Sequence, residues 1–92
     1  MKGLDPLVEE IPIPYFPFLI GKQEGIVDYE LHKDSVSRLH LRIDQDENTC
    51  SITDLHSSNG TIVKEHLLNA NESCELNSGD KVIIADISFV FD

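Results

Sequence analysis

The stretch of sequence that decides the fold is residues 37–54, which read SRLHLRIDQDENTCSITD. Apolar and polar residues alternate over 39–44, and this period of two is typical of a strand with one buried face. A polar break at 44–48 suits a hairpin turn, and the same alternation returns at 50–53. The stretch therefore predicts two strands joined by a tight turn.

Strand-like segments lie on both sides of this stretch. Residues 81–85 and 87–91 are β-branched and aromatic, and the polar residues 77–80 form a turn before them. Residues 16–20 predict an earlier strand, which the nearby prolines restrict to a sheet edge or an irregular start. Short strands separated by turn residues favour an all-β sandwich.

The length and composition are those of one globular domain. A chain of 92 residues, 40% hydrophobic and 26% charged, can bury one modest core. The helix signals at 23–33 and 64–72 are weak, and no apolar run reaches the length of a membrane span. We expect a single cytoplasmic domain over residues 1–92, with 1–10 as an irregular or frayed start.

The charge is strongly acidic and unevenly distributed. Seventeen acidic and seven basic residues give a net charge of −10, which disfavours binding to nucleic acid or to anionic membranes. Residues 22–42 hold four acidic and four basic residues, so the remaining 71 residues carry the whole net charge. If the protein binds an anionic ligand, residues 22–42 are therefore the stretch expected to bind it.

No pattern typical of a metal site is present. Cys50 and Cys74 form no C-x-x-C motif, and they are interpreted as small buried hydrophobic residues. The four histidines lack the spacing of zinc ligands. The acidic turn that begins at Asp44 resembles a calcium loop only at its start, because Thr49 and Leu55 replace the required Gly and Glu.

A catalytic triad is the weakest of the alternatives. Ser37, His40 and Asp54 are the residue types of a small hydrolase. Ser37, however, is not in a G-x-S-x-G turn, and a small sandwich offers little depth for a substrate. We therefore expect a protein that is not an enzyme.

Four short signals remain, and they occur in a fixed order. They are Gly21-Lys22, Ser37-Arg38-Leu39-His40, Ser57-Ser58-Asn59-Gly60-Thr61 and Gly79-Asp80-Lys81-Val82. Together, over about residues 17–91, they resemble the forkhead-associated (FHA) domain, a phosphothreonine-binding β-sandwich. The family pattern is G-R, then S-x-x-H, then N-G. This chain departs from it at Lys22, where the family has Arg.

The resemblance implies a sandwich of about eleven short strands in two mostly antiparallel sheets, with peptide-binding loops at one end. It implies that Lys22 and Ser37 contact phosphate, that Ser58 adds a contact, and that Asn59 holds the peptide main chain. Arg38 supplies further positive charge beside them. These residue types suit the chemistry, since a phosphate needs a cation and short hydroxyl or amide donors.

The other signature residues have structural roles by the same resemblance. Gly21 belongs to the first motif, and His40 braces the loops through hydrogen bonds rather than acting as a base. Gly60 provides backbone freedom, and Thr61 braces through its hydroxyl.

The resemblance implies a module without cofactor or metal that binds phosphothreonine-containing proteins in signalling or regulated assembly. We expect it to be part of a longer protein and monomeric as an isolated domain. The alternative is an FHA-like scaffold that binds partners independently of phosphorylation, because Lys22 cannot form the bidentate contact of an arginine.

Overall fold

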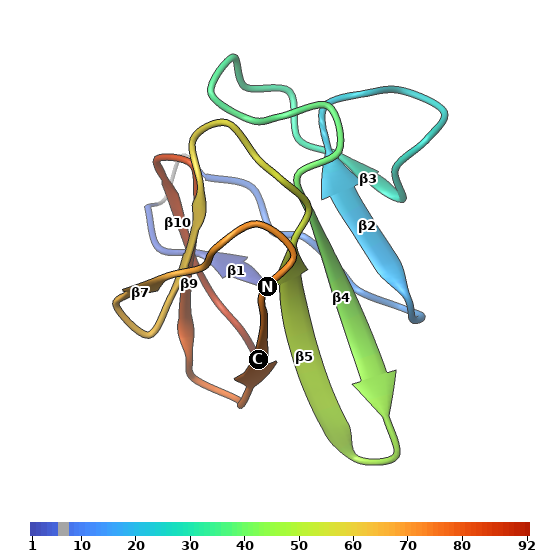
Figure 1. The fold of residues 1–92 in the computed structure, drawn as a ribbon, viewed down its shortest axis with the longest axis vertical. Helices are drawn as coiled ribbons and strands as arrows, with labels where there is room; N and C mark the ends of the chain where they lie inside the picture. The colour runs from blue at the N-terminus through green and yellow to red at the C-terminus, as the bar shows by residue number, and fades with distance from the viewer. Residues whose placement is uncertain (6–7) are drawn as a thin grey trace.

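A computed structural model describes residues 1–5 and 8–92. Over these residues the secondary structure consists of ten β-strands (Figure 1). They are β1 (Lys2–Gly3), β2 (Phe18–Gly21), β3 (Tyr29–Glu30), β4 (Leu41–Asp46), β5 (Thr49–Asp54), β6 (Thr61–Val63), β7 (His66–Leu67), β8 (Ser73–Leu76), β9 (Lys81–Ile84) and β10 (Ile87–Val90).

The strands form two five-stranded sheets, in the orders β1-β10-β9-β6-β7 and β3-β2-β4-β5-β8. Every neighbouring pair is antiparallel except β2 and β3, which are parallel. The predicted all-β sandwich of two mostly antiparallel sheets is therefore confirmed. The described part of the chain has ten strands, where the family resemblance implied about eleven.

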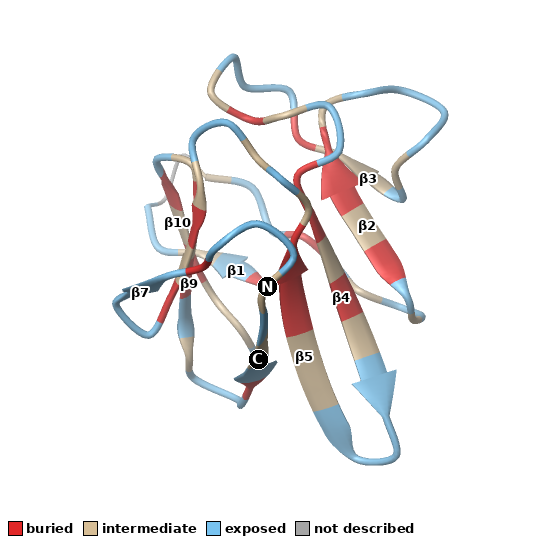
Figure 2. Ribbon diagram, in the orientation of Figure 1, coloured by how far each residue is buried: buried red, intermediate tan, exposed pale blue. Residues whose placement is uncertain are grey.

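The predicted hairpin is β4–β5, with Leu41 opposite Asp54 and Asp46 opposite Thr49. The turn is shorter than the sequence predicted, because β4 continues through residues 44–46. Its tip is exposed, as Figure 2 shows, so polar side chains remain solvated while their backbones pair. The two-residue turn includes Glu47 in a left-handed conformation with φ of 55°.

The core lies between the two sheets and is made by the alternating apolar residues of both. Fully buried side chains come from every central strand: Ile20, Leu41, Ile43, Ile52, Val63, Val82, Ile84 and Phe89. Burying one such side chain is worth about 1.5–3 kcal/mol. Leu31 and Val36 are also buried and come from the irregular segment 31–40, which is thereby anchored at the end of the sandwich.

The two weak helix signals do not produce helices. Residues 23–33 contain a turn and β3, and residues 64–72 contain turns and β7. Gly25, Lys64 and Asn71 have φ values of 86°, 51° and 64°, which lie in the left-handed region and cannot continue a right-handed helix. In the described ranges, no helix is long and apolar enough to cross a membrane.

The start of the chain, where an irregular or frayed segment was expected, includes a strand. β1 pairs with β10, and the Met1 side chain is buried in the core. The amino group of Met1 donates a hydrogen bond to the carbonyl of Ile11 and lies 3.5 Å from the carboxylate of Asp92.

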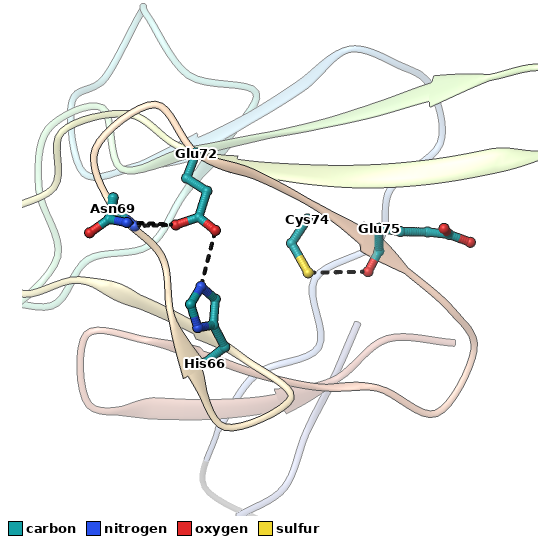
Figure 3. A network of polar contacts seen from close by, with 5 residues as sticks. All are labelled: His66, Asn69, Glu72, Cys74 and Glu75. Atoms are coloured by element: carbon teal, nitrogen blue, oxygen red, sulfur yellow. Dashed lines mark hydrogen bonds and ion pairs between the residues drawn. The ribbon is translucent and has the colours of Figure 1, made fainter.

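Cys50 and Cys74 are free, half-buried and packed against the core. They lie on neighbouring strands, where Cys74 is opposite Ile52 rather than Cys50. The Cys74 thiol donates to the carbonyl of Glu75 at 3.5 Å (Figure 3).

A polar network connects β7 to the segment before β8 (Figure 3). The Glu72 carboxylate accepts hydrogen bonds from the backbone N–H of Asn69 at 2.8 Å and from its side-chain amide at 3.1 Å, and it lies 3.0 Å from Nε2 of His66. The Asn69 backbone N–H, and then His66, lower the pKa of Glu72 from its usual value. The network holds the segment between β7 and β8 in place.

Candidate functional site

Three segments meet at the end of the sandwich remote from the β4–β5 turn (Figure 1). They are 22–28 after β2, 31–40 before β4, and 55–60 after β5. Together they form an open cleft of about 420 Å³. The cleft is lined by Lys22, Asp34, Ser35, Val36, Ser37, Arg38, Leu39, His56, Ser58 and Asn59. The structure thus brings together all five residues predicted to bind ligand.

The first two segments are joined through their backbones. The N–H of Lys22 donates to the carbonyls of Ser37 and Arg38, at 3.0 Å each. A Cβ atom at Gly21 would lie 2.1 Å from the Arg38 carbonyl oxygen, so only glycine permits this approach. The Lys22 side chain is thereby held on the same cleft as Ser37 and Arg38.

Ser37 is bonded through both its backbone and its side chain. Its N–H donates to Nδ1 of His40 at 3.1 Å, and its Oγ accepts from the backbone N–H of Ser58 at 2.9 Å. Within the described residues, the hydroxyl hydrogen of Ser37 has no acceptor. Since the side chain lines the cleft, this hydrogen is available to a ligand there.

His40 is fully buried and connects two of the three segments. Nδ1 accepts from Ser37, so Nε2 is the protonated nitrogen, and it donates to the carbonyl of Gly60 at 2.9 Å. Burial lowers the pKa of His40 from 6.5, although the Gly60 carbonyl and the nearby Asp54 carboxylate act in the opposite direction. His40 is therefore neutral at pH 7 and uses both ring nitrogens to hold backbone groups.

The residues of the considered triad do not form one. Nδ1 of His40 faces the backbone N–H of Ser37 rather than its hydroxyl, and Nε2 faces Gly60. The Asp54 carboxylate is hydrogen-bonded elsewhere. In this arrangement no nitrogen of His40 is placed to take a proton from the Ser37 hydroxyl.

Asp54 organises the third segment. Its Oδ1 accepts from the hydroxyls of Ser57 at 2.5 Å and Thr61 at 2.7 Å, and its Oδ2 accepts from the Ser57 backbone N–H at 3.1 Å. The Ser57 hydroxyl in turn accepts from the N–H of Gly60, whose φ of 88° suits glycine. Sequence reasoning missed the bracing role of Asp54 and Ser57, although Asp and Ser side chains commonly bond to nearby backbone groups in turns.

Asn59 connects the third segment to the second. Its Nδ2 donates to the backbone carbonyl of Ser35 at 2.7 Å. The sequence predicted that this amide would hold a peptide backbone, and in the structure it holds the protein's own segment 31–40. One amide hydrogen and the carbonyl oxygen of Asn59 have no partner in the part of the chain that the structure describes.

Two cations of the cleft are not neutralised. Lys22 is half-buried and Arg38 is exposed, and neither has an ion-pair partner in residues 1–5 and 8–92. Sequence reasoning did not place Asp34 or His56 on this cleft. Both are exposed loop residues, and no sequence signal distinguishes them from the other surface acids and histidines.

A comparison with known families agrees with this geometry. The FHA domain model matches residues 18–85, which is most of the chain. This chain belongs to the FHA domain family. The match begins at β2 and ends just after β9, so it includes all three segments that line the cleft.

Known FHA proteins resemble the chain in sequence and in fold. An FHA domain-containing protein of Arabidopsis thaliana, At4g14490, is 36% identical in an alignment 62 residues long, and the alignment covers 62% of this chain and 16% of that protein. A structure of Mycobacterium tuberculosis EmbR in complex with a low affinity phosphopeptide is 34% identical with a TM-score of 0.72, covering 80% of this chain and 19% of that one. The FhaA FHA domain complexed with the intracellular domain of Rv3910 has a TM-score of 0.81 at 24% identity, covering 97% and 93%.

Proposed function

We propose that this FHA domain binds phosphothreonine-containing protein segments in the cleft formed by its three loop segments. One observation carries the proposal. The side-chain cations of Lys22 and Arg38 and the hydroxyl hydrogen of Ser37 lie on one cleft, and among the described residues none of these groups has a partner. Two cations beside a hydroxyl donor match a phosphate group, which carries a charge near −1.5 to −2 at pH 7. The similarity to EmbR, whose structure contains a phosphopeptide, supports the same class of ligand.

Each residue has a role that follows from its chemistry. Lys22 and Arg38 supply positive charge, and Ser37 and Ser58 supply hydroxyl donors to the phosphate oxygens. Asn59 uses its remaining amide hydrogen and oxygen to hold the main chain of the bound segment. Lysine provides a point charge rather than a bidentate fork, so we expect binding to be weaker than an arginine would give.

Recognition without catalysis is part of this proposal. Because both nitrogens of His40 hold backbone groups, His40 is not available as a base for the Ser37 hydroxyl. His40 and Asp54 then serve to fix the loops that carry the binding residues.

The experiment is a titration against matched peptides. An oriented phosphothreonine library identifies the tightest-binding sequence, and calorimetry then compares that peptide with its threonine, phosphoserine and glutamate versions. We expect measurable binding only for the phosphorylated forms, with phosphothreonine the tightest. Equal binding of the threonine and phosphothreonine peptides would contradict the proposal and favour a scaffold that works independently of phosphorylation.

A further inference from the structure

His56 is held in an uncommon backbone conformation at the rim of the cleft. Its φ is 65°, in the left-handed region that few non-glycine residues adopt. The hydrogen bonds of Asp54 with Ser57 surround this position and fix it. The side chain is exposed and lines the cleft together with Lys22 and Ser58. Among the described residues its ring has no hydrogen-bond or ion-pair partner.

The net positive charge of the cleft lining is smaller than the negative charge of a phosphate dianion. Lys22 and Arg38 contribute two positive charges and Asp34 one negative charge, so the lining carries +1 when His56 is neutral. A phosphothreonine brings about −1.5 to −2. Protonation of His56 would raise the lining to +2 and match the dianion.

We propose that His56 takes up a proton when a phosphorylated segment binds, and that it acts as the third cation of the cleft. The inference rests on the proposed function and deepens it by adding a ligand-contacting residue outside the predicted set. The proton comes from solvent, and the imidazolium N–H donates to a phosphate oxygen.

The bound phosphate is the group that favours a protonated His56 ring. The charged residues that line the cleft with His56 are Lys22, Arg38 and Asp34. The nearby Asp54 carboxylate is turned toward Ser57 and Thr61. A phosphate bound beside His56 adds negative charge, and this charge favours the protonated form of the ring over the neutral form.

Because proton uptake by His56 is linked to phosphopeptide binding, the affinity should depend on pH in a specific way. A histidine changes charge between pH 5 and 8, so affinity should rise as the pH falls from about 8.5 to 6.5. Below about pH 6 the phosphate itself loses charge, and affinity should fall again. Replacing His56 should remove the rise in affinity between pH 8.5 and 6.5 and leave the fall in affinity below about pH 6.

The test compares wild type with His56→Asn, because asparagine also adopts the left-handed conformation. The matched control is His66→Gln, which removes the exposed ring beside Glu72 and outside the cleft (Figure 3). The tightest peptide of the phosphothreonine library is titrated calorimetrically at pH 7.0 in buffers with different ionisation enthalpies, which counts protons taken up. Binding is then repeated from pH 8.5 to 6.5.

We expect wild type and His66→Gln to take up more protons on binding than His56→Asn does. The ratio of the dissociation constants of His56→Asn and wild type should grow to about five- to tenfold at pH 6.5. In NMR, the titration midpoint of the His56 ring should move to higher pH in the complex.

Equal proton uptake by wild type and His56→Asn, with an unmoved ring titration, would overturn the inference and leave the proposed function intact. If wild type binds the threonine and phosphothreonine peptides equally, the proposed function fails and the inference fails with it. The two failures are therefore distinguishable.

Discussion

The backbone N–H of Ser58 donates to the Oγ of Ser37 at 2.9 Å, and this bond joins two loops that lie 21 residues apart in sequence. It uses the oxygen of Ser37 as an acceptor. The hydroxyl hydrogen is therefore left to donate to a ligand in the cleft that both residues line. The same contact holds the Ser58 backbone beside the Ser37 side chain.

Substitution Ser37→Ala should weaken phosphopeptide binding about ten- to a hundredfold, because a hydrogen bond to a charged group contributes about 1.5–3 kcal/mol. Calorimetry with the phosphothreonine peptide measures the change. Ser78→Ala, in the exposed turn before β9, is the matched control and should bind as wild type does. Equal affinity of wild type and Ser37→Ala would show that the phosphate does not contact Ser37.

This chain departs from the family pattern at Lys22. Substitutions of Lys22 therefore distinguish phosphate recognition from a scaffold that works independently of phosphorylation. Lys22→Ala should nearly abolish binding, since it removes one of two unpaired cations from the cleft. Lys22→Arg should tighten binding by about 0.5–1.5 kcal/mol, the net worth of one additional hydrogen bond.

Both Lys22 variants are titrated against one phosphopeptide in low and physiological salt. The charge contribution of Lys22 is screened by salt, so the difference between wild type and Lys22→Ala should be larger at low salt. If Lys22→Ala binds as well as wild type in both conditions, the cleft is not a phosphate site and the scaffold interpretation becomes the better one.

Asn59→Ala should weaken binding for a different reason. It removes the bond to the Ser35 carbonyl that holds segment 31–40, and it removes the amide expected to grip the peptide main chain. The salt dependence of binding should change little, because no charge is lost. Hydrogen exchange should become faster around residues 33–38, and an altered salt slope would instead indicate that Asn59 acts on the phosphate.

His40→Ala should destabilise the fold by about 2–4 kcal/mol. The substitution leaves a cavity, and it leaves the Ser37 N–H and the Gly60 carbonyl without their partner. Urea denaturation at pH 7.5 measures the loss. A value within 0.5 kcal/mol of wild type, about the size of ordinary surface substitutions, would show that the imidazole does not brace the loops.

The stability of the wild type should also depend on pH through His40. Its pKa is lowered in the folded state, so below about pH 6.5 the unfolded chain binds the proton first and stability falls with pH. Urea midpoints at pH 7.5 and 5.5 measure this effect. The decrease should be smaller in His40→Ala, which has no such group to titrate, and an equal decrease would assign the effect to other residues.

Much of the fold could be predicted from local patterns. Alternation over 39–44 and 50–53 indicated β4 and β5, because successive side chains of a strand face opposite sides of the sheet. The same reasoning misplaced the hairpin turn, since the polar residues 44–46 pair as a strand at an exposed tip. Polarity marks exposure, and exposure alone does not end a strand.

The sequence by itself determined the sandwich class, the family and the five residues expected to bind ligand, because strand periodicity and ordered motifs are local properties of the chain. Only the tertiary structure decided that Asn59 holds Ser35, that His40 joins Ser37 to Gly60, and that His56 faces the cleft with Lys22. These contacts join segments about twenty or more residues apart. The positions of these segments are set by the packing of the two sheets and by Leu31 and Val36, which anchor segment 31–40 in the core. No local sequence pattern encodes that geometry.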